Sequence, residues 1–228
     1  MAGEGRVRSV VLLSGGLDSA ANLAFCRLLD EPALALTIDY GQRAAQREGA
    51  AGRALARHFG VRHEVVSLPW LGELGGSALT DCSREVPRPR PDRLDELAAA
   101  QASAKAVWVP NRNGVLIQVG AAYAERSGAA RVVVGFNREE AATFPDNSAE
   151  FLRRATAALA LSTANTTAVH CYTTELDKRE IVAELARAVP SFPFALLWSC
   201  YFGGEKACGE CESCRRFARA TSSPGGHA

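Results

Sequence analysis

Two kinds of hydrophobic pattern alternate along the chain. Short apolar runs rich in branched residues predict buried strands over residues 7–13, 33–38, 63–68, 130–137 and 168–172. Longer segments with apolar positions at helical spacing predict helices over residues 18–29, 43–60, 114–128, 149–163 and 178–189. This alternation predicts an α/β fold in which a parallel, twisted sheet carries helices on both faces. Right-handed crossovers would bring the carboxyl end of every strand to one edge, where ligands bind in such folds.

The stretch SREVPRPRPDR, residues 83–93, interrupts this pattern with prolines and arginines. We interpret it as a solvated loop, with a mobile lid or a basic contact for phosphate as the alternative. We therefore expect a flexible, partly disordered insertion over residues 83–106, within an α/β domain over residues 1–190. Residues 191–228 would form a small C-terminal region that ends in a disordered tail.

The composition narrows the classes of function. Apolar residues make up 47% of the 228 residues, which is enough for a sizeable core. Lys and Arg total 26 against 25 Asp and Glu, and the net charge of +1 disfavours a protein that coats nucleic acid through bulk charge. No apolar stretch has the length of a membrane span, and the N-terminus lacks the features of a signal peptide. We expect a cytoplasmic protein.

The sequence SGGLDS, residues 14–19, joins the first predicted strand to the first predicted helix. Glycine permits positive φ and carries no side chain that would block an approaching ligand. The first amides of a helix lack partners within the helix, and together with the helix dipole they attract anions. The stretch therefore predicts a phosphate site. A plain turn, with Asp18 or Ser19 capping the helix, is the alternative.

Four of the seven cysteines crowd near the C-terminus, at Cys200, Cys208, Cys211 and Cys214. In a reducing compartment such a cluster indicates metal ligands rather than disulfides. Four thiolates suit tetrahedral zinc, and a closed shell of four protein ligands indicates a structural rather than a catalytic ion. Gly209 would ease the turn between the ligands. An iron–sulfur cluster and redox-active thiols are the alternatives.

The SGGLDS stretch after an apolar strand resembles the pyrophosphatase loop of the PP-loop ATPases. This resemblance implies a Rossmann-like fold of the adenine nucleotide alpha hydrolase type, in which the loop binds the β- and γ-phosphates of ATP and AMP passes to the substrate. It implies that Asp18 helps to hold Mg²⁺. The residues that it places against ATP in this stretch are Leu13, Ser14, Gly15, Gly16, Leu17, Asp18 and Ser19.

Further stretches resemble one member of that superfamily, the QueC family of 7-cyano-7-deazaguanine synthases. They are TIDYGQR (37–43), LGGSALTD (74–81), VPNRN (109–113), WSCY (198–201) and CGECESC (208–214). The resemblance runs from about residue 8 to residue 218. It implies that 7-carboxy-7-deazaguanine is activated by ATP and reacts with ammonia, giving first an amide and then the nitrile preQ0 of queuosine biosynthesis. It also implies structural zinc and a homodimer.

The resemblance assigns roles to further residues. It implies that Asp18, Arg112 and Lys178 are catalytic, the last two by stabilising charge on phosphate or on the acyl oxygen. Lys178 as a surface residue paired with Asp177 or Glu180 is the alternative. The other residues expected in the ATP site are Asp39, Tyr40, Gly41, Gln42, Arg112 and Asn113, although Asn113 could instead cap its helix.

One block departs from the family pattern. The chain has EEAATFPDNSAEF at residues 139–151, where the family usually shows a sequence resembling EDYSGYPDCRPEF. Asn147-Ser148 replaces a Cys-Arg pair, which removes a cation suited to a carboxylate or phosphate. From this block and the strand before it we expect substrate contacts at Asn137, Phe144, Pro145 and Asp146.

This departure leaves alternatives open. The chain could stop at the amide, or it could couple the activated acyl group to another amine, such as the N-terminus of a peptide or protein. A tRNA-modifying PP-loop enzyme and a zinc-ribbon protein that binds nucleic acid are more distant alternatives. The near-zero net charge and the lack of aromatic residues between basic ones disfavour both.

Overall fold

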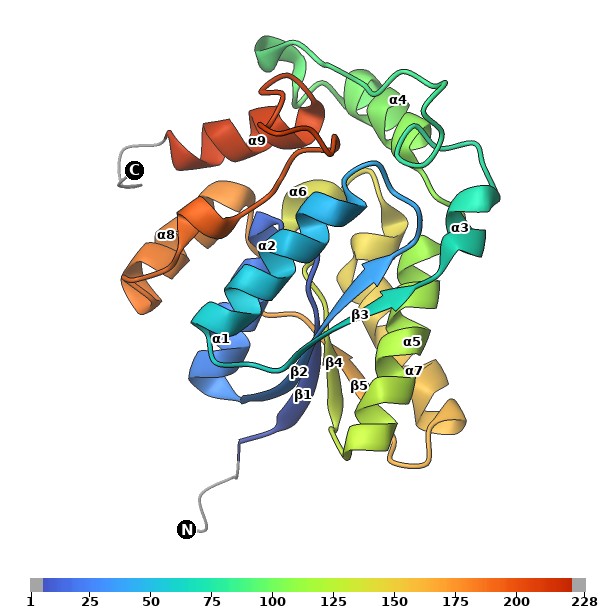
Figure 1. The fold of residues 1–228 in the computed structure, drawn as a ribbon, viewed down its shortest axis with the longest axis vertical. Helices are drawn as coiled ribbons and strands as arrows, with labels where there is room; N and C mark the ends of the chain where they lie inside the picture. Colours follow the sequence, from blue (N-terminus) through green and yellow to red (C-terminus); the bar gives the residue numbers. More distant parts are fainter. Residues whose placement is uncertain (1–5, 223–228) are drawn as a thin grey trace.

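A five-stranded parallel sheet forms the centre of the chain, for which a computed structural model describes residues 6–222 (Figure 1). The strand order is β3-β2-β1-β4-β5, and every neighbouring pair is parallel. This confirms the predicted α/β fold class. The part of the expected disordered tail at residues 223–228 lies outside the described residues. The strands are β1 Arg8–Leu12, β2 Glu31–Asp39, β3 His63–Ser67, β4 Arg131–Val133 and β5 Ala168–His170.

Helices cover both faces of this sheet, and each face has its own core. Neighbouring residues of β1 point in opposite directions, so that Val11 packs in one core and Val10 in the other. The first core includes side chains of α1 (Leu17–Leu29), α2 (Ala45–His58) and α8 (Lys178–Ala188). The second includes side chains of α5 (Arg112–Ser127) and α7 (Ala149–Ser162).

Local sequence signals set the ends of two of these helices. Gly128 follows α5 with φ of 65°, a conformation that glycine adopts without strain. Asp177 precedes α8 and accepts hydrogen bonds from the amides of Arg179 and Glu180, while Glu180 accepts one from the amide of Asp177. This reciprocal capping starts the helix at Lys178. Asp177 and Glu180 are therefore helix-capping residues, and the side chain of Lys178 points elsewhere.

Several elements were not predicted. The second half of the segment that we expected to be partly disordered forms α4 (Leu97–Val107), with Ser103, Ala104 and Val107 buried. The C-terminal region holds α9 (Glu212–Thr221), and α4 and α9 lie above the sheet at the top of Figure 1. The other short helices are α3 (Pro69–Glu73), α6 (Arg138–Ala141), and the 3₁₀ turns η1 (Pro91–Arg93), η2 (Pro145–Asn147) and η3 (Phe194–Leu196).

The last two strands are shorter than predicted. Their apolar sequence continues, but β4 ends at Val133, and Val134 and Phe136 are buried outside the sheet. Apolar burial without strand pairing explains why the hydrophobic pattern overestimated these strands. No helix within residues 6–222 combines the length and the apolar character that crossing a membrane requires.

Two leucines of α7 test the second core. Leu159 is fully buried, whereas Leu161 is 93% exposed. We expect Leu159→Ala to lower the free energy of unfolding by about 2–5 kcal/mol, because it removes apolar contacts and leaves a cavity. Leu161→Ala should change it by less than about 0.5 kcal/mol. Urea unfolding of both variants measures this, and equal losses would contradict the packing described here.

Candidate active site and metal centre

One cavity lies at the carboxyl edge of the sheet, where the chain leaves β1 and β4 in opposite directions. Open α/β sheets bind ligands at such a switch point. The phosphate-loop stretch 14–19 and the segments after β2 and β4 line the cavity, together with the start of α5. The C-terminal segments 198–201 and 212–217 also contribute to its wall. The cavity therefore joins parts of the chain that are far apart in sequence.

The two loop glycines have different tasks. Gly15 has φ of 83°, and a Cβ there would lie 2.6 Å from the Cβ of Ala51. It does not line the cavity, and its positive φ gives it a role in the turn, while its contact with ATP stays a prediction. Gly16 lines the cavity and precedes α1 with an ordinary φ of −75°. Because the residue at this position is glycine, no side chain caps the start of α1. The first turn of α1 is therefore left open to a ligand.

Two hydroxyl groups hold the loop in shape. The Oγ of Ser19 donates to the carbonyl of Gly16 at 3.1 Å and accepts from the amide of Ser14 at 3.2 Å. The two serine Oγ atoms lie 3.1 Å apart. A Cβ on Gly135, after β4, would lie 2.5 Å from the nitrogen of Ser19. The backbone after β4 therefore packs directly against the backbone of α1, with no room for a side chain. The loop is thus fixed from two sides before any ligand enters.

Lys178 occupies the centre of the charged part of the cavity. Its Nζ donates to Asp18 and lies 2.9 Å from Glu140, and only 8% of its side chain is exposed. Burial alone would lower the pKa of this ammonium, but the two carboxylates outweigh burial and hold the pKa above its ordinary value. The alternative of a surface lysine paired with Asp177 or Glu180 is wrong.

Asp18 has one oxygen available to a cation. Its Oδ2 accepts from Lys178, whereas its Oδ1 is buried and has no hydrogen-bond partner within residues 6–222. Burial raises the pKa of this carboxyl above its ordinary value, against the opposing effect of Lys178. Oxygen donors of this kind suit Mg²⁺, so the residue fits the ion that the sequence predicted.

The start of α5 contributes a second cation. Arg112 lines the cavity, and its guanidinium carbon lies 6.0 Å from the centre of the Tyr40 ring. Asn113 also lines the cavity and donates to the carbonyl of Asp146 at 3.4 Å. The residue that precedes α5 is Asn111, which makes no side-chain cap. Asn113 therefore bridges to the 139–151 block and does not cap its helix.

Besides Gly15, five residues predicted in the site do not line the cavity. Asp39 accepts from the amide of Gly41 at 3.0 Å, so these two residues form the turn after β2. Asn137 is fully buried and caps α6 by accepting from the amide of Glu140 at 3.0 Å. Pro145 and Asp146 belong to the turn η2, in which the last residue, Asn147, lines the cavity together with Phe144 just before the turn. Among the predicted residues after β2, Tyr40 and Gln42 do line the cavity.

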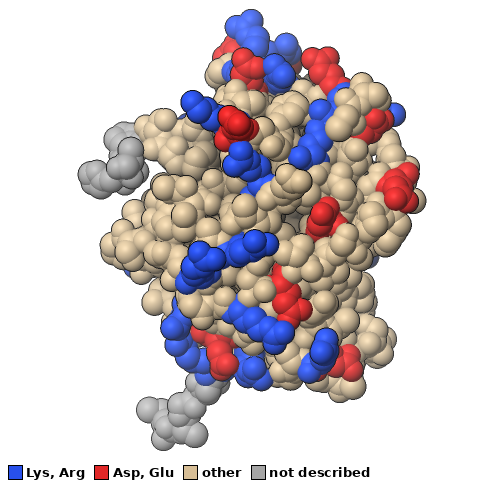
Figure 2. All heavy atoms as spheres, in the orientation of Figure 1, with Lys and Arg blue, Asp and Glu red and all other residues tan. Residues whose placement is uncertain are grey.

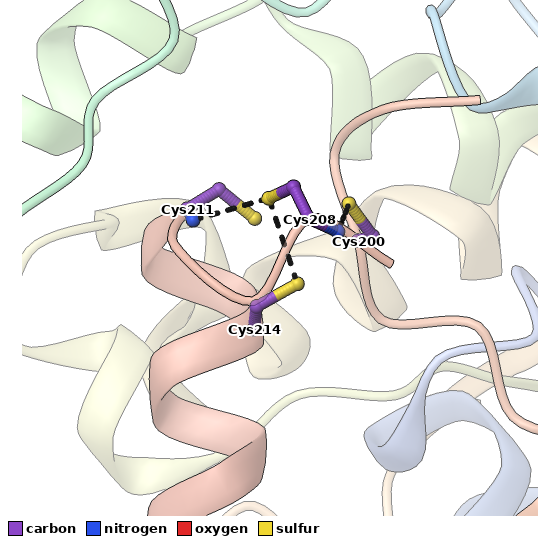
Figure 3. A group of neighbouring side chains, drawn as sticks. All are labelled: Cys200, Cys208, Cys211 and Cys214. Atoms are coloured by element: carbon purple, nitrogen blue, oxygen red, sulfur yellow. Dashed lines mark hydrogen bonds between the residues drawn. The ribbon is translucent and has the colours of Figure 1, made fainter. Parts of the chain in front are cut away.

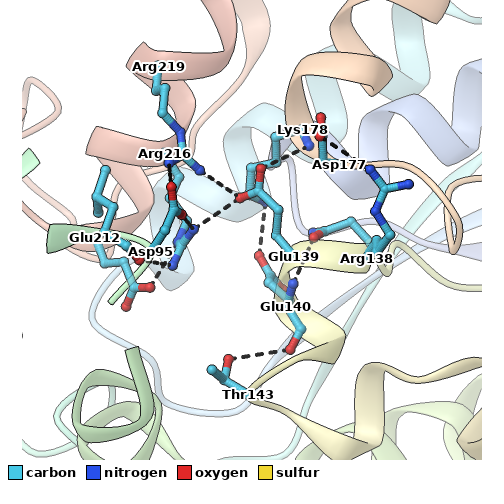
Figure 4. A network of polar contacts seen from close by, with 12 residues as sticks. Asp95, Arg138, Glu139, Glu140, Thr143, Asp177, Lys178, Glu212, Arg216 and Arg219 are labelled. Atoms are coloured by element: carbon cyan, nitrogen blue, oxygen red, sulfur yellow. Dashed lines mark hydrogen bonds and ion pairs between the residues drawn. The ribbon is translucent and has the colours of Figure 1, made fainter. Parts of the chain in front are cut away.

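A network of charges between α6 and α9 was not predicted from the sequence (Figure 4). Glu139 accepts from Arg216 at 3.1 Å and from Arg219 at 3.2 Å. Arg216 also donates to Glu212 at 2.9 Å and to the carbonyl of Leu94 at 2.8 Å. Glu139, Arg216 and Glu212 line the cavity. A run of arginines after the last cysteine was the only signal in the sequence, and spacing alone does not reveal contacts across about 80 residues.

The four clustered cysteines form a compact sulfur site (Figure 3). Their Sγ atoms all lie within 4.8 Å of one another. The amide of Cys208 donates to the Sγ of Cys200 at 3.4 Å, and the amide of Cys211 donates to the Sγ of Cys208 at 3.3 Å. Gly209 makes the turn with φ of 73°. Converging thiols that receive amide hydrogen bonds fit a tetrahedral metal ion such as zinc.

This sulfur site lies next to the cavity. Cys200 lines the cavity with Trp198 and Tyr201, and α9 begins directly after Cys211. Tyr201 is partly buried, and this burial raises its pKa well above the ordinary value for tyrosine. The cysteines therefore hold in place the segments that carry the charge network and one wall of the cavity.

Known proteins resemble this chain over almost its whole length. The family model described as "Queuosine biosynthesis protein QueC" matches residues 8–224. The chain belongs to the QueC family. This confirms the resemblance noted in the sequence.

Curated QueC relatives are similar over almost the whole chain. The "7-cyano-7-deazaguanine synthase" of Desulforudis audaxviator is 53% identical over 220 residues, which cover 96% of this chain and 99% of the relative. The protein of the same name from Pelotomaculum thermopropionicum is 52% identical over 219 residues, covering 96% and 98%. Among solved structures, NMN synthetase from Francisella tularensis is 14% identical with a TM-score of 0.45, covering 95% of this chain and 84% of that one.

Removing one thiol tests the metal centre. Cys211 is buried in the cluster, whereas Cys82 is exposed and outside it. We expect Cys211→Ser to lose most of the bound zinc, because three thiolates hold the ion less tightly than four. Cys82→Ser should keep one zinc per chain. Metal analysis of the purified variants measures this, and full retention of zinc by Cys211→Ser would contradict the assignment.

Proposed function

We propose that this chain is an ATP-dependent carbon–nitrogen ligase that converts 7-carboxy-7-deazaguanine and ammonia into 7-cyano-7-deazaguanine, with release of AMP and pyrophosphate. The observation that carries the proposal is the convergence in one cavity of an uncapped glycine loop with Lys178 and Arg112. Relatives that match 96% of the chain are named 7-cyano-7-deazaguanine synthase, and this name supports the substrate and the nitrile product.

ATP would lie across the switch point. The open amides at the start of α1 would bind its β- and γ-phosphates, and Asp18 would hold Mg²⁺ through Oδ1. That ion would neutralise phosphate charge. The apolar side chains of Leu36, Ile38 and Ile117 line the cavity near the end of β2 and offer a surface for the adenine ring.

The acid would be activated between this nucleotide and the 139–151 block. A carboxylate is a poor acyl donor because it would have to expel oxide. Its oxygen would attack the α-phosphorus of ATP, the bond to pyrophosphate would break, and an acyl adenylate would form. Lys178 and Arg112 would stabilise the charge that develops on the phosphate oxygens. Both are held by neighbours before the reaction, so little reorganisation is needed.

Ammonia would then attack the acyl carbon, expelling AMP and leaving a primary amide. A second ATP would adenylate the amide oxygen, and loss of two protons and AMP would give the nitrile. Each activation forms a bond between an oxygen of the substrate and the α-phosphorus of an ATP molecule. One rigid loop and one pair of cations would therefore serve both. We also keep a homodimer in the proposal, on the resemblance alone.

The alternatives keep different weights. Stopping at the amide, or coupling the acyl group to another amine such as a protein N-terminus, would use the same first step. The departure at Asn147 is the observation that keeps these outcomes under test. Binding of nucleic acid finds less support: on the face drawn in Figure 2, acidic side chains lie among the basic ones and much of the surface is uncharged.

Isotope exchange between pyrophosphate and ATP tests the proposed reaction. We expect exchange that depends on 7-carboxy-7-deazaguanine, because adenylation of the acid is reversible. Mass spectrometry after addition of ammonia should detect the nitrile, and detection of only an amide or a conjugate would favour the corresponding alternative. Fully zinc-loaded protein that shows no exchange with this acid would contradict the proposal.

Substitutions at the two loop glycines should affect different properties, the stability of the fold at Gly15 and the binding of ATP at Gly16. At Gly16 a Cβ would meet Ser14 Oγ at 3.6 Å, an ordinary contact, so Gly16→Ala should fold normally. Its methyl group would stand in the way of phosphate, and we expect ATP binding to weaken by about tenfold or more. Gly15→Ala should instead lose about 1–3 kcal/mol of stability through strain at positive φ. Calorimetric ATP titration and urea unfolding measure the two effects, and tight ATP binding by Gly16→Ala would refute the assignment.

A further inference from the structure

We propose that Asn147 recognises the hydrogen-bond donor edge of the heteroaromatic acid, with Phe144 as the flat wall beside it. This inference rests on the proposed function, since it assumes a guanine-like acceptor. It adds to that function the residue that determines which ring system is accepted.

Asn147 is a buried amide with one unused group. Its side chain lines the cavity, although the residue is only 4% exposed. Its Nδ2 donates to the carboxylate of Asp146 at 3.3 Å. Because a carboxylate accepts and does not donate, this contact fixes the amide orientation and turns Oδ1 away from Asp146. Within residues 6–222, Oδ1 has no protein hydrogen-bond partner.

Three carboxylates of the cavity wall are already engaged by protein cations or donors. Glu140 is paired with Lys178, and Glu139 with Arg216. Glu212 accepts from Ser103 and from Arg216. Asn147 therefore offers a ligand an uncharged acceptor at the cavity wall. Its Oδ1 accepts no hydrogen bond from the described part of the chain, so it is free to accept one from a ligand donor.

Phe144 stands next to this amide on the same turn. The amide of Asn147 donates to the carbonyl of Phe144 at 2.9 Å, so the two residues are held together. Behind Phe144 lies Trp108, with ring centres 6.2 Å apart and planes inclined by 10°. This stack fixes the orientation of Phe144 as a flat apolar surface in the cavity. The turn is also tied to α5 by the bond from Asn113 to the carbonyl of Asp146.

The chemistry of the acid matches this pair. A 7-deazaguanine ring is planar, and it carries its N1–H and 2-amino donors on the six-membered ring. The carboxyl group at C7 lies on the five-membered ring, at the other end of the molecule. The acid can therefore present its carboxylate to the nucleotide while its donor edge meets Oδ1 of Asn147. A ring that lacks the 2-amino group loses a donor at this edge.

Two acids and three proteins test the inference. Pyrophosphate exchange is measured with 7-carboxy-7-deazaguanine and with its analogue that lacks the 2-amino group. We expect the native chain to prefer the first acid by about tenfold in kcat/KM, the effect of one hydrogen bond to a buried group. Asn147→Ala should reduce this preference to within about twofold and leave the KM for ATP unchanged. Gln118→Ala, which removes an exposed amide of α5, should keep the native preference.

Three controls make the outcome decisive. Zinc content and ATP titration establish that Asn147→Ala is folded, and calorimetric titration with each acid gives the preference again if turnover is too slow. A tenfold preference that survives in Asn147→Ala, or no preference in the native chain, would overturn this inference alone. Absence of exchange with either acid would overturn the proposed function and this inference with it.

Discussion

The arrangement of the site depends on one buried ammonium group. Lys178 begins α8, and its Nζ meets carboxylates from α1 and α6. A buried charge is tolerated only with partners of opposite charge. These three elements therefore cannot separate without exposing a charge to water or leaving it buried without a partner. The partners also fix where the loop 14–19 stands relative to the 139–151 block. The same contact that stabilises the fold thus sets the spacing between loop 14–19 and the 139–151 block in the cavity wall.

The C-terminal region extends this constraint to the metal centre. Structural zinc sites contribute on the order of 10–16 kcal/mol in peptides, more than most single contacts in a protein. Here the cysteines precede and begin α9, whose Arg216 pairs with Glu139 of α6. Glu139 is adjacent to Glu140, the partner of Lys178. A metal ion held by these cysteines would therefore stabilise one wall of the cavity and the charges behind it.

Local signals explain which parts of this arrangement could be predicted. The hydrophobic pattern located the strands, the pair Asp177 and Glu180 marks the start of α8, and cysteine spacing located the cluster of thiols that could hold a metal ion. The sequence did not predict α4, which depends on a partner distant in the chain, or the local capping role of Asn137. Helix α4 has a weak pattern of its own and is fixed partly by the contact of Ser103 with Glu212. Asn137 is polar and follows a strand, which suggested a ligand contact, yet its side chain caps α6.

The departure at residues 147 and 148 has two separate physical meanings. Ser148 accepts from the amide of Phe151 at 3.1 Å and caps α7, and it does not line the cavity. Serine is a strong helix cap, whereas arginine is not, so the residue at 148 serves the backbone in this chain. The cavity lining of this chain carries the cations Arg112, Lys178 and Arg216. Of the two positions, only 147 places its side chain in the cavity lining.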